Sequence, residues 1–166
     1  MPDRLHVAVV EGDVATALTL LNGAVGIEDR NANGWTALME AAAHGQADMV
    51  RMLLAMGADI DARTRGGSTA LMLAVAVGDG EMVSLLLEAG SDVRALGLQG
   101  TALTWAVRMG HFEIARTLLD AGAVIDEADL FLAICGGRSS TALVQLLLER
   151  GADVDMPDAR GRTALD

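Results

Sequence analysis

The amino-acid sequence predicts an all-α fold of stacked helix–turn–helix units, and two markers that recur with one period carry this prediction. The tripeptide Thr-Ala-Leu begins at Thr36, Thr69 and Thr101, so it returns after about 33 residues each time. A glycine ends each long apolar run with nearly the same spacing, at Gly57, Gly90, Gly122 and Gly151. Because the two markers share a period, we expect one supersecondary unit that buries its apolar face against copies of itself.

The composition agrees with closely packed helices. Apolar residues make up 52% of the chain and charged residues 21%, so intrinsic disorder is not expected. Aromatic residues make up only 2%, and the apolar side chains are therefore mostly Ala, Leu, Val and Met. Only two prolines interrupt the chain, and Val and Ile form no long alternating runs, which argues against strands.

The unit over residues 33–62 shows how the elements follow from the sequence. Residues 37–44 predict a first short helix, with apolar side chains on one face, that ends at Gly45. Residues 47–56 predict a second helix, whose apolar stripe has helical spacing. Gly57 then occupies the place of a left-handed C-cap residue. The polar, glycine-containing segment that follows predicts a turn or extended finger that leads to the next unit.

These segments resemble the ankyrin repeat family, whose period is about 33 residues. The matching segments are "GWTALMEAAAHG", "DMVRMLLAMGADIDA", "STALMLAVAVG", "EMVSLLLEAGSDV", "GTALTWAVRMGHFEIARTLLDAGA" and "ALVQLLLERGADVD". The resemblance covers nearly the whole chain. It implies a solenoid of about five repeats with finger loops, in a single domain over 1–166. The expected units are about 1–31, 32–64, 65–96, 97–126 and 127–157, then a partial stub, 158–166.

The first unit is expected to place its second helix at roughly Val14 to Leu21. The family has a histidine three positions after the marker threonine. Here those places hold Met39, Met72 and Thr104, so we expect the side-chain hydrogen bond of that histidine to be missing.

The unit after Gly122 departs most from the pattern. Leu130 follows Gly122 much more closely than Leu71 follows Gly57, so the finger of the fifth repeat is expected to be shorter. The same unit carries two extra residues in "CGGRSST", and we expect a disturbed stack there. The stub is expected to be either a short cap or the end of a fragment.

The net charge of −11 indicates which classes of partner the chain can attract. A polyanion repels nucleic-acid phosphates and acidic lipid headgroups, so neither nucleic acid nor membrane is expected. Another protein with a basic patch fits the charge, although the charge can also serve solubility alone. One cysteine excludes an internal disulfide framework. The first residues carry an acid and no long apolar core, so no secretory signal is expected, and no apolar stretch has membrane-spanning length. We expect a cytoplasmic monomer.

Few residues support catalysis. The histidines His6, His44 and His111 fall in three different units, and no histidine follows the last of them to activate Cys135. We therefore expect Cys135 to be a partly buried thiol. The carboxylates of 126–129 lack the alternating spacing of a calcium loop. We expect no enzyme activity, no cofactor and no metal.

The resemblance implies that finger loops and first helices line a concave binding surface. The residues expected to bind a partner there are Trp35, Glu40, His44, Arg65, Val77, Trp105, Arg108 and Met109. Trp and Arg are the residue types most enriched among binding hot spots. Trp105, Arg108 and Met109 are expected to form one compact patch. Packing against neighbouring first helices stays open for Trp105, and the absence of any contact role stays open for His44.

The sequence thus predicts a non-catalytic scaffold that binds another protein through its concave face and finger loops. Two alternatives stay open. One is an acidic inhibitor or immunity-type protein that masks a basic site. The other is a regulatory fragment of a larger enzyme.

Overall fold

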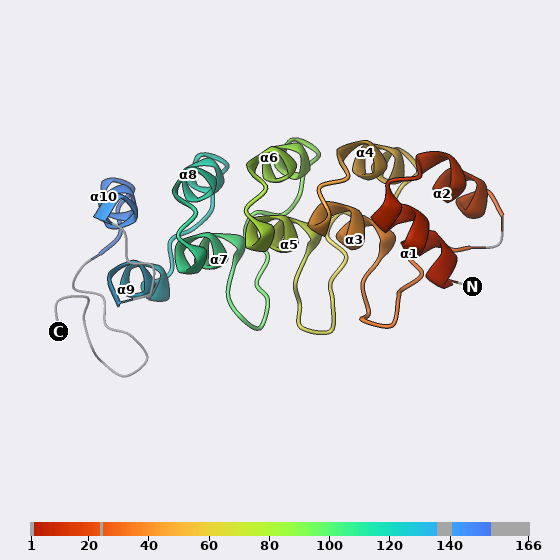
Figure 1. Cartoon of the computed structure of the whole chain (residues 1–166). Coiled ribbons are helices and arrows are strands. Elements are labelled where there is room, and N and C mark those ends of the chain that lie inside the picture. The colour runs from red at the N-terminus through yellow and green to blue at the C-terminus, as the bar shows by residue number, and fades with distance from the viewer. Residues whose placement is uncertain (1, 24, 136–140, 154–166) are drawn as a thin grey trace. The chain divides into compact units, whose positions relative to one another are not determined.

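The computed structural model describes residues 2–23, 25–135 and 141–153, and the described residues form ten helices (Figure 1). Consecutive helices pair as first and second helix of one repeat. The pairs are α1 (Pro2–Glu11) with α2 (Val14–Leu21), α3 (Ala37–Ala43) with α4 (Ala47–Ala55), α5 (Ala70–Val77) with α6 (Gly80–Glu88), α7 (Ala102–Met109) with α8 (Phe112–Asp120), and α9 (Glu127–Cys135) with α10 (Thr141–Glu149). The all-α prediction with about five repeats is confirmed.

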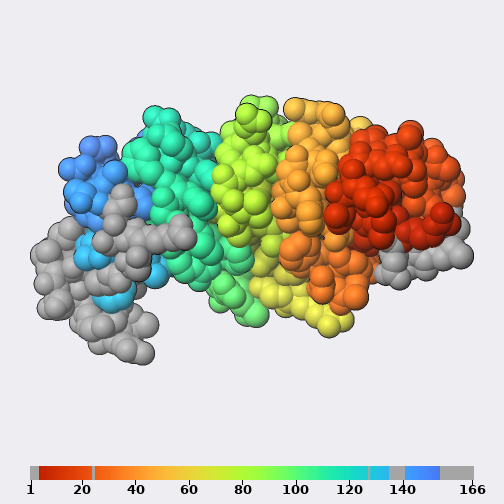
Figure 2. All heavy atoms as spheres, in the orientation of Figure 1, coloured from red at the N-terminus to blue at the C-terminus, as the bar shows by residue number. Residues whose placement is uncertain are grey.

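The chain forms two compact units, Met1–Asp92 and Val93–Asp166. In the first unit α3 packs against both α1 and α5, and each first helix packs against its own second helix. The three repeats of this unit follow one another as red, orange and yellow-green atoms (Figure 2). In the second unit α7 packs against α8 and α9, and α9 packs against α10. The single domain over 1–166 stays a prediction.

Small and unbranched side chains make close helix packing possible. On α3, Ala37, Ala41 and Ala42 are completely buried, and Leu38 is 2% exposed. On α4, Leu53 is completely buried. Because alanine lets two helix backbones approach closely while leucine fills the remaining space, each short helix is stabilised by its neighbours rather than by its own propensity. None of the helices in the described ranges has the length and apolar character needed to cross a bilayer.

The recurring threonine starts each first helix. The side-chain oxygens of Thr36, Thr69 and Thr101 accept hydrogen bonds from backbone N–H groups three positions on, at 3.4, 3.4 and 3.3 Å. This satisfies one of the otherwise unpaired amides of the helix N-terminus. The expected loss of a side-chain hydrogen bond is wrong at Thr104. Its hydroxyl accepts from the Thr101 backbone N–H at 3.2 Å, which completes a capping box.

Finger loops join the repeats: the first lies between α2 and α3, the second between α4 and α5, and the third between α6 and α7. In the first unit the fingers extend to the side opposite the second helices (Figure 1). In the first finger, the Asn31 N–H donates to the Trp35 carbonyl at 2.9 Å, and in the second finger Thr64 donates to Ser68 in the same way at 2.9 Å. Arg30 connects these two fingers, because its guanidinium donates to the carbonyls of Gly34 at 2.7 Å and Arg63 at 2.9 Å. The fingers of the first unit therefore support one another.

The fifth repeat has the shorter finger that the sequence predicts. Only residues 121–126 separate α8 from α9, whereas 56–69 separate α4 from α5. The helix α9 also begins earlier in the register of the repeat than α3 does, since Leu130 corresponds to Leu38. The extra residues predicted in 136–140, the side chain of Cys135 and the stub 158–166 lie outside the described residues.

Candidate functional site

The predicted binding residues fall into both compact units. Trp35, Glu40, His44, Arg65 and Val77 belong to the first, and Trp105, Arg108 and Met109 belong to the second. The two groups are therefore considered one at a time.

In the first unit the exposed candidates lie at the ends of the first helices and on the fingers. Val77 is the last residue of α5 and is 61% exposed. His44 follows α3 and is exposed, but its ring nitrogen Nδ1 donates a hydrogen bond to the backbone carbonyl of Glu40 at 2.9 Å. Arg65 is exposed at the tip of the second finger, and its side chain lies alongside Gly34 of the first finger. Trp35 is half-buried at the base of that finger.

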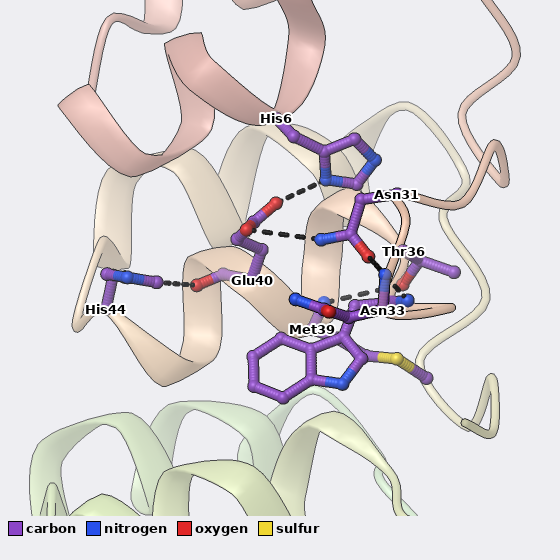
Figure 3. A network of polar contacts seen from close by, with 8 residues as sticks. His6, Asn31, Asn33, Thr36, Met39, Glu40 and His44 are labelled. Carbon is purple, nitrogen blue, oxygen red and sulfur yellow. Dashed lines mark hydrogen bonds and ion pairs between the residues drawn. The ribbon is translucent and has the colours of Figure 1, made fainter. Parts of the chain in front are cut away.

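Glu40 is a predicted binding residue whose side chain is held in a network of polar contacts (Figure 3). One carboxylate oxygen pairs with Nδ1 of His6 on α1, and the other accepts from the Asn31 side-chain amide at 3.3 Å. The side chain of Glu40 is only 12% exposed and that of His6 is 5% exposed. Asn31 also accepts from the N–H groups of Asn33 and Trp35, so the network fixes the finger against α1 and α3.

A cavity of about 350 Å³ opens beside this network. His6, Val7, Val10 and Glu11 of α1 line one side, and the finger residues 31–33 with Glu40 line the other. Val7 is 54% exposed and Val10 is 39% exposed. The cavity therefore combines an apolar wall with amide and carboxylate groups, which is the composition of many ligand pockets.

In the second unit, the predicted patch is formed by α7 and the third finger. The Arg108 guanidinium lies 5.2 Å from the ring centroid of Trp105, and it donates to the Gln99 side chain at 3.2 Å. This is the geometry of a cation–π contact. Trp105 is half-buried, and its Nε1 is buried without a hydrogen-bond partner in the described part of the chain. Met109 is half-buried and follows Arg108 directly.

Sequence reasoning missed Leu98, whose side chain is 86% exposed at the tip of the third finger. It lies between Gly97 and Gly100, whose backbones exchange two hydrogen bonds at 3.1 and 3.2 Å and hold the turn closed. Alignment of the fingers offers the signal, because the equivalent positions hold Ala32 and Arg65. Leu96 is also 62% exposed, so two large apolar side chains lie at this turn, and an exposed apolar patch is a candidate contact surface.

Of the acidic residues in 126–129, Asp126 and Asp129 make local hydrogen bonds to the backbone. The Asp129 side chain accepts from the Asp126 backbone N–H at 2.9 Å and is completely buried. Burial raises the pKa of Asp129 to about 6. Within the ranges that the structure describes, no group of three or more His, Cys, Asp or Glu side chains is placed to hold a metal ion.

Paired helices that are joined by finger loops and repeat along the chain define the class of helical repeat proteins. The chain belongs to the ankyrin repeat family, whose model for three copies of the repeat matches residues 5–97 and 64–129.

Two relatives from Caenorhabditis elegans are similar to this chain. The ankyrin repeat and KH domain-containing protein mask-1 is 37% identical over 162 residues, which are 94% of this chain and 5% of that protein. The E3 ubiquitin-protein ligase hecd-1 is 40% identical over 72 residues, which are 40% of this chain and 3% of that protein. The chain thus matches a small part of each of these much longer proteins.

Proposed function

We propose that this chain is a non-catalytic scaffold that binds another protein through its finger loops and first helices. Ankyrin repeats are generally protein–protein interaction modules. The proposal assigns the contacts in this chain to the two groups of residues described above, one on each compact unit.

The arrangement of side chains on the third finger and α7 is the observation that best supports the proposal. Leu98 exposes nearly all of its side chain on a turn that is closed by backbone hydrogen bonds. Arg108 is held by both Trp105 and Gln99. A partner that binds here meets an apolar anchor and an oriented guanidinium with little conformational entropy left to lose. Trp and Arg are also the residues that most often dominate binding energy.

The charge of −11 supports a partner with a basic surface. Complementary charges raise the rate of encounter and disfavour acidic partners. Nucleic acid and anionic membranes do not fit this charge, because their phosphates repel it.

Site-specific photo-crosslinking tests the proposal. A photoreactive phenylalanine derivative replaces Leu98 in one variant and Leu148 in the control. Leu148 is a suitable control because it is also an exposed leucine, 41% accessible, but lies on the second helix α10. We expect one polypeptide from a lysate of the source organism to be crosslinked from position 98 and not from 148.

The identity of that contact is tested by a second substitution. Arg108→Ala is expected to weaken the crosslink from position 98 about tenfold, because hot-spot truncation commonly costs more than about 1 kcal/mol. Equal crosslinking from positions 98 and 148, or a product that is insensitive to Arg108→Ala, would overturn the assignment of the surface.

A further inference from the structure

The cavity beside His6 and Glu40 contains a carboxylate at a position where other repeats are apolar. Glu40 occupies the same place in its repeat as Val7, Leu73 and Trp105. The carboxylate is held from two sides, by His6 and by Asn31 (Figure 3). A carboxylate can accept about four hydrogen bonds, so these two contacts leave part of its acceptor capacity unused.

His6 positions this carboxylate at the wall of the cavity. His6 is 4% exposed, its Nδ1 pairs with Glu40, and its Nε2 is buried with no hydrogen-bond partner in the described residues. The unpaired ring nitrogen adds hydrogen-bonding capacity to the wall that His6 and Glu40 share.

A second carboxylate lies at the same cavity. Glu11 is exposed at the end of α1 and makes no ion pair within the described part of the chain. Apart from His6, no basic side chain among the residues described lines the cavity. The exposed side chains of Val7 and Val10 provide the apolar wall beside these charges.

We propose that this cavity receives one arginine side chain of a protein partner, with its aliphatic stem against Val7 and Val10 and its guanidinium on Glu11 and Glu40. The inference rests on the proposed function, since it names a chemical feature of the partner. A volume of about 350 Å³ accommodates one long side chain and part of the adjoining backbone. The carboxylates at the cavity complement the positive charge of arginine locally. The net charge of the whole chain, −11, is also negative and attracts the same partner.

Arginine fits this cavity better than lysine does. A guanidinium has five donors in a planar fork and can bond two carboxylates and an amide oxygen at once. The acceptors here come from three segments, with Glu11 on α1, Asn33 on the finger and Glu40 on α3. Guanidinium is also less strongly hydrated than ammonium, so it enters a half-apolar cavity at a lower desolvation cost.

The test titrates the full chain with a small probe and measures the binding by two-dimensional NMR. The probe is the blocked tripeptide acetyl-Gly-Arg-Gly-amide, and its neutral isostere carries citrulline in place of arginine. We expect saturable shifts of the Val7 and Val10 methyl signals and of the Asn33 side-chain amide. The citrulline peptide is expected to bind about tenfold more weakly, because a hydrogen bond to a charged group is worth about 1.5–3 kcal/mol.

Two matched variants distinguish binding at the cavity from a general attraction of the arginine peptide to an acidic protein. Glu11→Gln removes one carboxylate at the end of α1, and Glu88→Gln removes an exposed carboxylate at the equivalent end of α6. Both changes suit a helix C-terminus, so the fold is expected to persist, which circular dichroism checks. Glu11→Gln is expected to weaken arginine binding about tenfold, and Glu88→Gln is expected to leave it unchanged.

Equal shifts with the arginine and citrulline peptides, or equal losses in the two variants, would overturn the arginine site. The proposed function does not depend on this result, because crosslinking from position 98 reports on the other unit. Failure of that crosslink with intact arginine binding would instead reject the surface of the third finger and keep the cavity.

Discussion

At the scale of single residues, Asp129 is the least expected feature of the core. In the register of the repeat it corresponds to Ala37, Ala70 and Ala102, all of them buried. One of its oxygens accepts from the Asp126 N–H, and the other is buried without a partner among the described residues. The carboxyl group therefore replaces a methyl group in a place that excludes water, and its charged form is destabilised.

This burial predicts that the fifth repeat becomes less stable as pH rises. The pKa of Asp129 lies at about 6 in the folded chain and at 3.8 without the fold, so the folded chain binds the proton more tightly. The free energy of unfolding should fall as pH increases from about 4 to above 6, by on the order of 2–3 kcal/mol from this residue alone. Denaturant unfolding of wild type and Asp129→Asn, each near pH 4 and near pH 7.5, measures this contribution.

The variant serves as the reference because other carboxylates titrate in both proteins. Asp129→Asn keeps an acceptor for the Asp126 N–H but cannot ionise. We expect its stability to change less than that of wild type between the two pH values. An identical pH dependence in both proteins would contradict a buried, perturbed carboxyl group at this position.

A change at Leu98 is expected to affect partner binding but not the stability of the fold. Because its side chain is 86% exposed, Leu98→Ser should leave the melting temperature nearly unchanged. If it is a contact anchor, the same change should weaken partner binding by about 1–2 kcal/mol. Leu53→Ala is the matched control in a completely buried position, and it should cost about 2–5 kcal/mol of stability through a cavity. Unchanged partner affinity in Leu98→Ser would remove this residue from the binding surface.

At the scale of elements, the threonine caps predict which change weakens a first helix. Thr69 is 1% exposed, and its hydroxyl accepts from the Met72 N–H at 3.4 Å. Thr69→Val preserves the volume but removes the acceptor, so it should cost about 1 kcal/mol of unfolding free energy. Thr69→Ser keeps the acceptor and should cost less. Chemical denaturation of the two variants checks the order, and a valine variant as stable as the serine variant would show that the cap contributes little.

The elements themselves can be predicted from the sequence because they depend on local patterns. The sequence predicts the second helix of the first repeat at roughly Val14 to Leu21, and α2 spans these residues. It predicts Gly57 as a left-handed C-cap residue, and the φ of Gly57 is +88°. The spacing from Gly122 to Leu130 likewise predicts the short finger of the fifth repeat. In each case glycine geometry or helical periodicity is a property of neighbouring residues.

The candidate site can be predicted only in part, because its contacts join distant residues. His6 and Glu40 are 34 positions apart, and their pairing depends on how two repeats stack. Sequence reasoning places Glu40 on the binding side but not in a network with His6 and Asn31. It also groups Asp129 with the acidic residues Asp126 and Glu127 rather than with the core, because a carboxylate is rarely buried. Which side chains share an interface depends on packing between repeats, and a periodic pattern leaves that open.

At the scale of the whole molecule, the excess of acidic residues is the dominant property. The chain has 23 Asp and Glu residues against 12 arginines, so even complete pairing of the arginines would leave the net charge of −11. Among the described residues, the ion pairs Arg116–Glu113 and Arg150–Asp120 are largely exposed. Exposed pairs contribute little to stability. The uncompensated negative charge therefore opposes folding by mutual repulsion.

This repulsion predicts that salt has opposite effects on folding and on binding. Raising NaCl from about 20 mM to about 300 mM shortens the screening length from roughly 20 Å to below 10 Å. The melting temperature should rise because repulsion within the chain is screened. Affinity for a partner with a basic surface should fall, because the attraction is screened too.

The sequence isoelectric point of about 4.5 supplies the internal control for the salt effect on folding. Near that pH the net charge approaches zero, so the increase in melting temperature with NaCl should largely disappear. The measurement is best made on Asp129→Asn, in which the titration of the buried carboxyl group does not add to the effect. An equal increase at pH 4.5 and pH 7 would mean that salt acts on the protein by some route other than its net charge, and the charge argument for a basic partner would lose its support.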